Sequence, residues 1–419
     1  MPILQLAYKS LWNRRLTALL TLISIALSVT LLLGVEKLRN ESRSSFANTI
    51  SGTDLIVGAR SGSTQLLLYS VFRIGSATNN ISWQSYQELA HHPKVQWSIP
   101  IALGDSHRGF RVMGTTAEYF QHFQYSRNKG LSFASGQHFS GLYDAVLGAD
   151  VARELGYAQG QSIVIAHGAG DVSLIRHDDK PFRVVGILNK TGTPVDRTIH
   201  VSLQGIEAIH VDWRGGAKLP GYNISAEQAE RMALQPKSIT AFMLGLKSRL
   251  ATFHVLREIN EYPQEPLLAI MPGVALQELW DMMGVAEKAL LAISAFVVIV
   301  GLTGMVTVIL TSLNERRREM AILRSVGAKP LHIFGLILGE AISLTLIGSI
   351  LGLFLLYGLL FIALPLIESQ WGLFIDISWP SVYELQLLLA VIVSGILISI
   401  LPAYRAYRYS LADGMSIRI

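Results

Sequence analysis

The chain contains no cysteine, and only 16% of its 419 residues are charged. The absence of cysteine excludes disulfides, thiolate catalysis, Cys-ligated zinc and iron–sulfur clusters. Soluble domains usually carry roughly a quarter charged residues. Half of this chain is apolar, which argues against an ordinary single soluble enzyme, and its length allows two or three domains.

Common catalytic and nucleotide-binding motifs are also absent. The sequence holds no HExxH motif, no acidic calcium loop, no Walker A lysine motif and no GxSxG elbow. Ten of the eleven histidines lie between residues 36 and 285. Among them, His177–Asp179 could bind a metal, but the following Lys180 and Pro181 favour a turn. We therefore predict no metal site and no catalytic residue, and we expect Gly58–Gly62 to form a flexible loop.

The apolar residues are concentrated in four long runs. Each run is long enough to cross the hydrocarbon core as a helix, the conformation that satisfies its own backbone in lipid. We predict membrane-spanning helices at residues 17–35, 289–313, 331–367 and 385–402. The first run exceeds the length of a signal-peptide core, and no small-x-small cleavage site follows before Glu36. We expect it to remain as an anchor.

Basic residues flank one side of the predicted membrane. Residues 1–16, an amphipathic segment, together with 314–330 and 403–419 carry net charges of +3, +3 and +2, whereas the short loop 368–384 has no Lys or Arg. The positive-inside rule then places both termini in the cytoplasm. The large extracytoplasmic region, residues 36–285, has 23 basic and 22 acidic residues. It is nearly neutral, so the net charge of +5 is a topology signal and not a nucleic-acid footprint.

Residues 36–285 predict an α+β domain carried on two helical stalks, at 36–50 and 274–288. Between the stalks, short runs rich in β-branched residues predict strands at 95–103, 110–114, 145–147, 162–166, 182–188, 198–201 and 239–246. Capping and periodicity predict helices at 82–89, 150–155 and 251–259. In the second stalk, Leu276, Leu279, Met283 and Ala286 form an apolar stripe. The stalks either transmit force or act as spacers.

The predicted membrane helices contain small and hydroxyl residues at helical spacing. Such residues allow membrane helices to approach closely. The candidates are Thr17, Thr21, Ser24 and Ser28 in the first helix and the pairs Gly335/Gly339 and Gly348/Gly352 in the third. Glu340 is an ionisable residue inside the third run, which indicates a functional or buried partner. A structural hydrogen bond to a neighbouring helix is favoured over a proton relay.

The loop 314–330 combines charge with apolar residues. It begins with a charged turn and predicts a short helix that ends at Gly327 and Pro330. Ala321, Ile322 and Val326 are expected to form a small apolar face. Such a helix suits a groove on a soluble partner, whereas a plain positive-inside loop would explain only the arginines.

Several segments resemble known permeases. NERRREMAILRSVGAKPLHIFGLILGEAI resembles the coupling loop of the FtsX-like permease family, and the start LAYKSLWNRRLTALLTLISIALSV and the ending PAYRAYR are similar to that family's first span and tail. Within the outer region, AVLGADVARELGYAQGQSIVI and FRVVGILNKTGTPVDRTIHVSL resemble the periplasmic core domain of MacB-type permeases. Tyr404, Tyr407 and Tyr409 depart from the family's tail, where small residues or Leu are more usual.

The resemblance implies a non-catalytic permease of the type VII ABC superfamily, in a bacterial inner membrane. Such permeases dimerise, bind two cytoplasmic ATPase subunits and move their outer domains by mechanotransmission. This chain shows no fused ATPase domain, so a separate ATPase that binds ATP and Mg is expected, with no cofactor in the chain itself. By motif, the ATPase-coupling residues are Glu315, Arg318, Glu319, Ala321, Leu323, Arg324, Gly327 and Ala328.

The substrate and some partners stay open. The first hypothesis is transport or release of an envelope substrate such as a lipoprotein, peptide, antibiotic or metal carrier. The alternatives are a signalling scaffold that regulates a cell-wall hydrolase or senses peptides, and a metal-related transport component suggested by the outer histidines. The second permease subunit is either identical or different. A periplasmic lipoprotein, adaptor or substrate protein is a further candidate partner.

Overall fold

The computed structural model describes residues 15–126, 128–168, 177–214, 217–218, 224–371 and 378–408. The chain divides into two compact units, which we describe separately. The helical unit comprises residues 1–41, 283–369 and 375–419, and the α+β unit comprises residues 42–282 and 370–374. Most of the predicted amphipathic segment 1–16, and the tail beyond Arg408 with Tyr409, lie outside the described residues.

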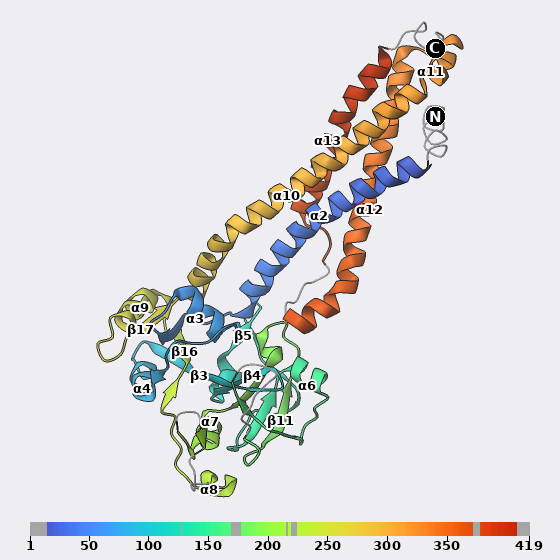
Figure 1. Ribbon diagram of the computed structural model, residues 1–419. Helices are drawn as coiled ribbons and strands as arrows, with labels where there is room; N and C mark the ends of the chain where they lie inside the picture. The colour runs from blue at the N-terminus through green and yellow to red at the C-terminus, as the bar shows by residue number, and fades with distance from the viewer. Residues whose placement is uncertain are drawn as a thin grey trace. The chain divides into compact units, whose positions relative to one another are not determined.

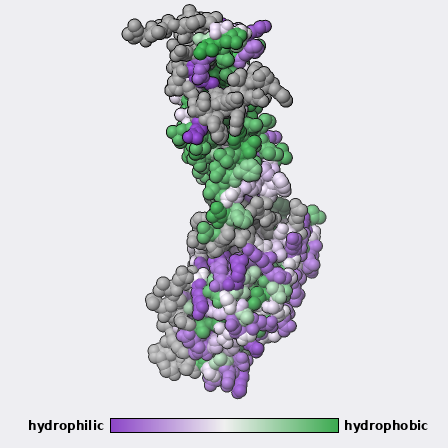
Figure 2. Space-filling view, turned by 90° about the vertical axis from the view of Figure 1, so that its right-hand side faces the viewer, coloured by the Kyte–Doolittle hydropathy of each residue, from purple (hydrophilic) through white to green (hydrophobic). Residues whose placement is uncertain are grey.

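Four long helices form the helical unit (Figure 1). They are α2 (Arg15–Thr49), α10 (Pro272–Glu315), α12 (Pro330–Trp371) and α13 (Val382–Tyr407). All four are long and apolar enough to cross a membrane, which confirms the predicted membrane-protein fold. Figure 2 shows mostly hydrophobic residues on the visible face of these helices, as lipid contact requires.

The predicted stalks are continuous with the first two spans. Helix α10 has 44 residues, a length of ~66 Å at 1.5 Å per residue, which is about twice the thickness of the hydrocarbon core. Its first residues belong to the α+β unit and its last residues to the helical unit. Helix α2 likewise runs unbroken from Arg15 to Thr49 and crosses the boundary between the units.

An 11-stranded mixed sheet organises the α+β unit. The strand order is β17-β1-β16-β3-β4-β12-β8-β11-β7, while β10 pairs with β3 and β9 pairs with β11. The strands are β1 (Leu55–Ala59), β3 (Val95–His107), β4 (Phe110–Thr115), β7 (Phe133–Gly136), β8 (Asp144–Leu147), β9 (Ser162–Ile163), β10 (Ala166–His167), β11 (Phe182–Leu188), β12 (Thr198–Ser202), β16 (Ala241–Leu246) and β17 (Leu267–Ile270). The predicted α+β class is confirmed.

Short helices and ribbons complete this unit. The helices are α3 (Ser63–Ser70), α4 (Trp83–Ala90), α5 (Glu118–His122), α6 (Ala149–Leu155), α7 (Leu203–His210), α8 (Ala226–Glu230) and α9 (Thr252–Asn260), with 3₁₀ turns η1 (Pro194–Arg197) and η2 (Arg249–Ala251). Two-stranded ribbons pair β2 (Ile81–Ser82) with β15 (Ser238–Ile239), β5 (Gln124–Tyr125) with β6 (Lys129–Gly130), and β13 (Trp213–Arg214) with β14 (Ala217–Lys218). The predicted helix at 82–89 exists because the Ser82 hydroxyl accepts a hydrogen bond from the backbone N–H of Ser85.

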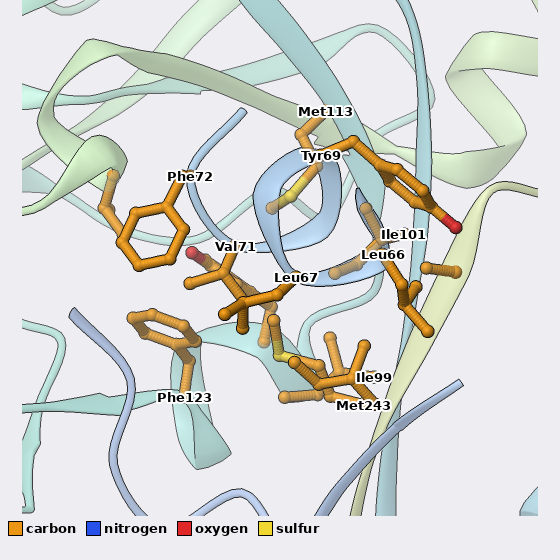
Figure 3. Packing of buried hydrophobic residues seen from close by; sticks show 14 of the residues in the cluster. Leu66, Leu67, Tyr69, Val71, Phe72, Ile99, Ile101, Met113, Phe123 and Met243 are labelled. Carbon is orange, nitrogen blue, oxygen red and sulfur yellow. The ribbon is translucent and has the colours of Figure 1, made fainter. Parts of the chain in front are cut away.

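Strand β1 corrects part of the expectation of a flexible loop at Gly58–Gly62, because Gly58 and Ala59 belong to the strand and only residues 60–62 connect it to α3. All five residues of β1 are buried, because β16 and β17 flank the strand and α3 packs near it. A Cβ on Gly58 would lie 2.5 Å from both Leu66 Cδ1 and Tyr69 Oη. The glycine therefore serves the close approach of α3 to the sheet, and Figure 3 shows Leu66, Leu67 and Tyr69 in the core that results.

Two predicted strands are divided in the structure. The expected strand 162–166 is split into β9, which pairs with β11, and β10, which pairs with β3. The expected strand 239–246 is split into β15, which pairs with β2, and β16, which pairs with β1 and β3. The two parts of each divided segment pair with different strands, and local residue preference does not encode this division.

The base of α10 is part of the α+β core. Ala275 is buried there, and Leu276 packs against the same cluster. The Trp280 ring meets Phe46 of α2 edge-on, with centroids 5.4 Å apart, and the Arg43 guanidinium lies 5.6 Å from the Trp280 centroid. The two stalks therefore touch within this unit. Beyond Trp280 the predicted apolar stripe is exposed, since Met283 and Ala286 are not covered by described residues.

His200 makes the stability of the α+β unit depend on pH. Its ring is fully buried on β12 and stacks on Tyr119 of α5 with centroids 5.2 Å apart. Burial, and then the nearby Arg73, lower the pKa of His200 to about 3. In the unfolded state the His200 ring takes up a proton near pH 6.5, whereas in the folded state it stays neutral until the pH is much lower. The contribution of the neutral His200 to the free energy of unfolding is therefore fully present above pH 6.5 and is lost as the pH falls below it.

We expect His200→Gln to flatten the acid limb of the stability curve. Between pH 6.5 and 5, protonation of His200 in the unfolded state should cost the wild type about 2 kcal/mol that the variant does not lose. Thermal unfolding of the full chain over this pH range measures the difference. Parallel curves for the two proteins would contradict the assignment.

Candidate coupling segment of the helical unit

A buried ion pair fixes the start of the segment between α10 and α12. Arg316 follows α10 directly and precedes α11 (Arg317–Ser325). Its Nη1 donates to Glu340 Oε2 on α12 at 3.0 Å, and its Nε donates to Glu319 Oε2 at 3.1 Å. Arg316 and Glu340 are both buried. Glu340 therefore accepts a hydrogen bond from Arg316, which lies between α10 and α11, whereas the sequence analysis favoured a donor on a neighbouring helix and did not select Arg316.

Helix α11 has one face on the helical bundle and one face outward. Met320 and Ala321 are buried in the apolar cluster of the helical unit. Ile322 and Val326 are 55% and 83% exposed. The expected face of Ala321, Ile322 and Val326 is thus divided, because Ala321 points inward. Two apolar side chains and the exposed carboxylate of Glu319 remain on the outer side.

A Schellman motif ends α11. Gly327 has φ of 101°, and its N–H donates to Arg324 O while the Ala328 N–H donates to Leu323 O, both at 3.0 Å. This left-handed conformation suits glycine, and the two bonds satisfy carbonyls at the helix end. Gly327 and Ala328 therefore fix where α11 stops. Leu323 and Arg324 are half-buried, and the side chains of Glu315 and Arg318 lie outside the described residues.

The predicted packing residues fall into two groups. Gly348 and Gly352 of α12 meet α2, where an added Cβ would lie 2.8 Å from Ile25 Cγ2 and 2.7 Å from Ala26 O. The Thr30 hydroxyl also donates to Gly352 O at 2.9 Å. By contrast, no described atom would lie within 4 Å of a Cβ at Gly335 or Gly339. Only the second glycine pair lies at a helix contact among the described residues.

Only part of the hydroxyl face predicted on α2 is buried in helix packing. Thr21 and Ser28 are buried, and the Ser28 hydroxyl lies 3.2 Å from Val297 O of α10. Thr17 and Ser24 are exposed, although their carbonyls accept bonds from the Thr21 and Ser28 hydroxyls. Contact with α10 is therefore made near Ser28.

The first residues of the predicted tail, up to Tyr407, belong to α13. Ala403 and Ala406 are buried in the apolar cluster of the helical unit, and Tyr404 and Tyr407 are exposed and stacked with centroids 6.3 Å apart. Of the tyrosines that depart from the family pattern, Tyr404 and Tyr407 therefore point outward. The small residues of the pattern face the bundle.

One group of side chains was missed by the sequence reasoning. His167, His177 and His210 come together in the α+β unit. The turn expected at His177–Asp179 is present, since the Lys180 N–H donates to His177 O at 3.1 Å. Burial, and then the neighbouring His210 and His167, lower the pKa of His177 to about 4. The three histidines belong to separate elements, so no spacing in the sequence reveals them.

Comparison with known proteins assigns both halves of the chain. Residues 16–238 match the model of the MacB-like periplasmic core domain, which covers more than half of the chain, and residues 291–411 match the FtsX-like permease C-terminal model. The macrolide export ATP-binding/permease protein MacB of Nitrobacter winogradskyi is 24% identical over 353 residues, 81% of this chain and 50% of that protein. The pyoverdine export ATP-binding/permease protein PvdT of Pseudomonas entomophila is 23% identical over 97% of this chain and 58% of its own length.

The chain spans about half the length of these two relatives. Among solved structures, the periplasmic region of MacB from Actinobacillus actinomycetemcomitans aligns with 55% of this chain and 94% of its own, at 10% identity and a TM-score of 0.34. With four apolar helices and a periplasmic-type domain, the protein is a membrane protein with an extracytoplasmic domain. The chain belongs to the MacB-like family of ABC transporter permeases, which joins a MacB-like periplasmic core domain to an FtsX-like permease C-terminal region.

Proposed function

We propose that the chain is the permease subunit of an ATP-driven machine of the mechanotransmission type. Two cytoplasmic ABC ATPase subunits bind ATP and Mg, two permease chains form the membrane dimer, and both termini lie in the cytoplasm of a bacterial inner membrane. The chain itself performs no catalysis. The observation that carries the proposal is α11, a short helix with a buried anchor on the bundle and two exposed apolar side chains on its outer side.

Helix α11 suits the docking of a soluble partner. Ile322 and Val326 offer an apolar contact of the kind that a helix inserts into a groove. Glu319 and Lys329 add exposed charges of both signs beside them, which would orient the partner. Because Met320 and Ala321 are buried in the bundle, a push on the outer side of α11 is received by the helices behind it.

Helix α10 supplies a path for the force. Its last residue, Glu315, is followed by Arg316, which is tied to α12 through Glu340. Its first turns contribute Ala275 and Leu276 to the core of the extracytoplasmic domain. A single unbroken helix therefore connects the proposed docking segment with that core. Moving it would act on an envelope substrate without a catalytic site in this chain.

The substrate class follows from the relatives only as a proposal. MacB and PvdT are named for export of macrolides and of pyoverdine. In this chain the two stalks contact each other through Phe46 and Trp280, so a movement of one stalk would be passed to the other. We propose that the extracytoplasmic domain handles an envelope substrate for export or release.

Substitution of the exposed apolar residues of α11 tests the docking. Val326→Asp combined with Ile322→Asp should abolish recovery of a Walker A-containing ABC ATPase with the permease purified from native membranes, because charge would replace the apolar contact. The permease should still insert at wild-type level. The matched control is Leu250→Asp, which changes a 94% exposed leucine of η2 and should leave recovery unchanged. Equal recovery with all three proteins would refute the assignment of α11.

A further inference from the structure

Three imidazoles meet at one point of the extracytoplasmic domain. His167 ends β10, His210 ends α7, and His177 belongs to the segment that precedes β11. Their candidate ligand nitrogens all lie within 4.8 Å of one another. The rings of His167 and His210 are stacked with centroids 4.4 Å apart, and His177 stands edge-on to both at 5.0 Å.

Among the described residues, the buried side chain of His177 has no hydrogen-bond partner. Its side chain is 0% exposed, and neither ring nitrogen bonds to any described residue. The Nε2 atom of His210 is likewise buried and unbonded among the described residues. Buried polar atoms in folded proteins nearly always have a hydrogen-bond partner. The two ring nitrogens of His177 and Nε2 of His210 make no hydrogen bond among the described residues, and this needs an explanation.

Neighbouring oxygens orient two of the rings. Nδ1 of His167 lies 3.0 Å from Asp105 Oδ1, and Nδ1 of His210 lies 2.8 Å from the carbonyl oxygen of Ile206. Asp105 Oδ1 also lies 3.8 Å from Nε2 of His210, so this one carboxylate stands beside two of the three rings. A histidine held by a carboxylate or a carbonyl at one nitrogen is the usual outer arrangement around a bound metal ion.

The rest of the surroundings holds the cluster in place. Trp213 packs on His177 and His167, with centroids 4.7 and 5.3 Å apart. The His177 segment is tied down by Lys180, whose Nζ lies 2.9 Å from Asp212 Oδ1 in a fully buried ion pair. The positive charge of Lys180 is therefore matched by a carboxylate and does not oppose a cation at the histidines.

We propose that His167, His177 and His210 bind one divalent transition-metal ion, with Zn²⁺ as the expected ion. Imidazole suits Zn²⁺, Cu²⁺ and Ni²⁺ and suits Mg²⁺ or Ca²⁺ poorly. Three histidines leave a fourth tetrahedral position for a water or another ligand. At a Zn–N distance of ~2.1 Å, tetrahedral ligands lie about 3.4 Å apart, so a small inward movement of the rings completes the site.

The ion would join three separate parts of the domain. Its ligands come from β10, α7 and the His177 segment, and β10 pairs with the long strand β3 through His167 and Asp105. Gly104 and Gly168, the sequence neighbours of Asp105 and His167, line a cavity of about 280 Å³. Metal occupancy would therefore stiffen the sheet edge beside this cavity.

A second group of histidines provides the matched control. His92 and His254 both lie 3.4 Å from Glu258 Oε2, but His254 also lies 3.0 Å from Lys94 Nζ. That ammonium opposes a cation. The double variant His92→Asn with His254→Asn removes two outer histidines beside a carboxylate and leaves the proposed site intact.

Titration of the full-length, chelator-treated protein in detergent with ZnCl₂ tests the proposal. Calorimetry should show one Zn²⁺ per chain, and binding should raise the unfolding temperature. The single variant His177→Asn should lose this binding, and Asp105→Asn should weaken it about 10–100-fold. The control double variant should bind as the wild type does. Stoichiometric binding that survives in His177→Asn, or no binding to the wild type, would overturn the proposal.

Cobalt substitution separates a ligand role from a structural one. Co²⁺ in the wild type should give the intense visible absorption of a four-coordinate site, and His210→Gln, at a half-exposed position, should abolish it. Unfolding of the metal-free proteins shows whether each variant is folded. If His177→Asn is unfolded, the outcome rests on His210→Gln. Weak absorption of six-coordinate, adventitious Co²⁺ in the wild type would also contradict the proposal.

Discussion

Replacing Arg316 by alanine is expected to destabilise the helical unit by about 3–5 kcal/mol, because it leaves the buried carboxylate of Glu340 without its cation. The Nη1–Oε2 distance is 3.0 Å, and both side chains are less than a tenth exposed. Thermal unfolding in detergent and the amount of protein in the membrane measure this loss.

The double variant Arg316→Met with Glu340→Leu is the control. Removing both charges replaces an ion pair by apolar groups of similar size, which is often neutral or stabilising. We expect most of the lost stability to return. A double variant as unstable as Arg316→Ala would show that the two charges are not coupled and that Arg316 acts through other contacts.

Replacing Gly352 by valine is expected to cost about 1–3 kcal/mol or to separate α2 from α12. An added Cβ would lie 2.7 Å from Ala26 O and 2.8 Å from Val29 Cβ. The first is a backbone atom that cannot move independently of α2. Unfolding of the monomeric chain in detergent gives the magnitude.

The same helix provides a matched substitution. Gly339→Val changes the same residue type on α12, where no described atom would lie within 4 Å of the new Cβ. We expect this change to be neutral or slightly stabilising, since valine is a better helix former than glycine. Equal losses for Gly339→Val and Gly352→Val would mean that the close approach of α2 is not what the glycine serves.

Features governed by one dominant force could be predicted from the sequence. A lipid bilayer requires long apolar helices, so all four spans can be recognised as apolar runs in the sequence. The predicted strand 182–188 likewise coincides with β11. Strand β1 was missed because its buried residues LIVGA lead into a glycine-rich loop. Its assignment depends on α3 and on strands β16 and β17 from the far end of the domain.

The candidate sites show the same limit. Glu340 signals a partner by itself, but local pattern does not single out Arg316 from the other arginines beside it. Helix α11 has a buried face with Ala321 and an exposed face with Val326, and this division depends on how the helix packs against the bundle. The three histidines are brought together only by the pairing of β10 with β3 and by the end of α7.

The central claim is that nucleotide turnover by a partner ATPase moves the helix that enters the extracytoplasmic domain. Because the chain has no native cysteine, Val285→Cys on α10, at a position that is 76% exposed, accepts a single spin label per chain. Pulsed electron paramagnetic resonance on the permease–ATPase complex then measures the distance between the two labels of a dimer. We predict different distances with and without a non-hydrolysable ATP analogue, and no difference when Ile322→Asp and Val326→Asp are present. One unchanged distance in a complex that hydrolyses ATP would contradict the account.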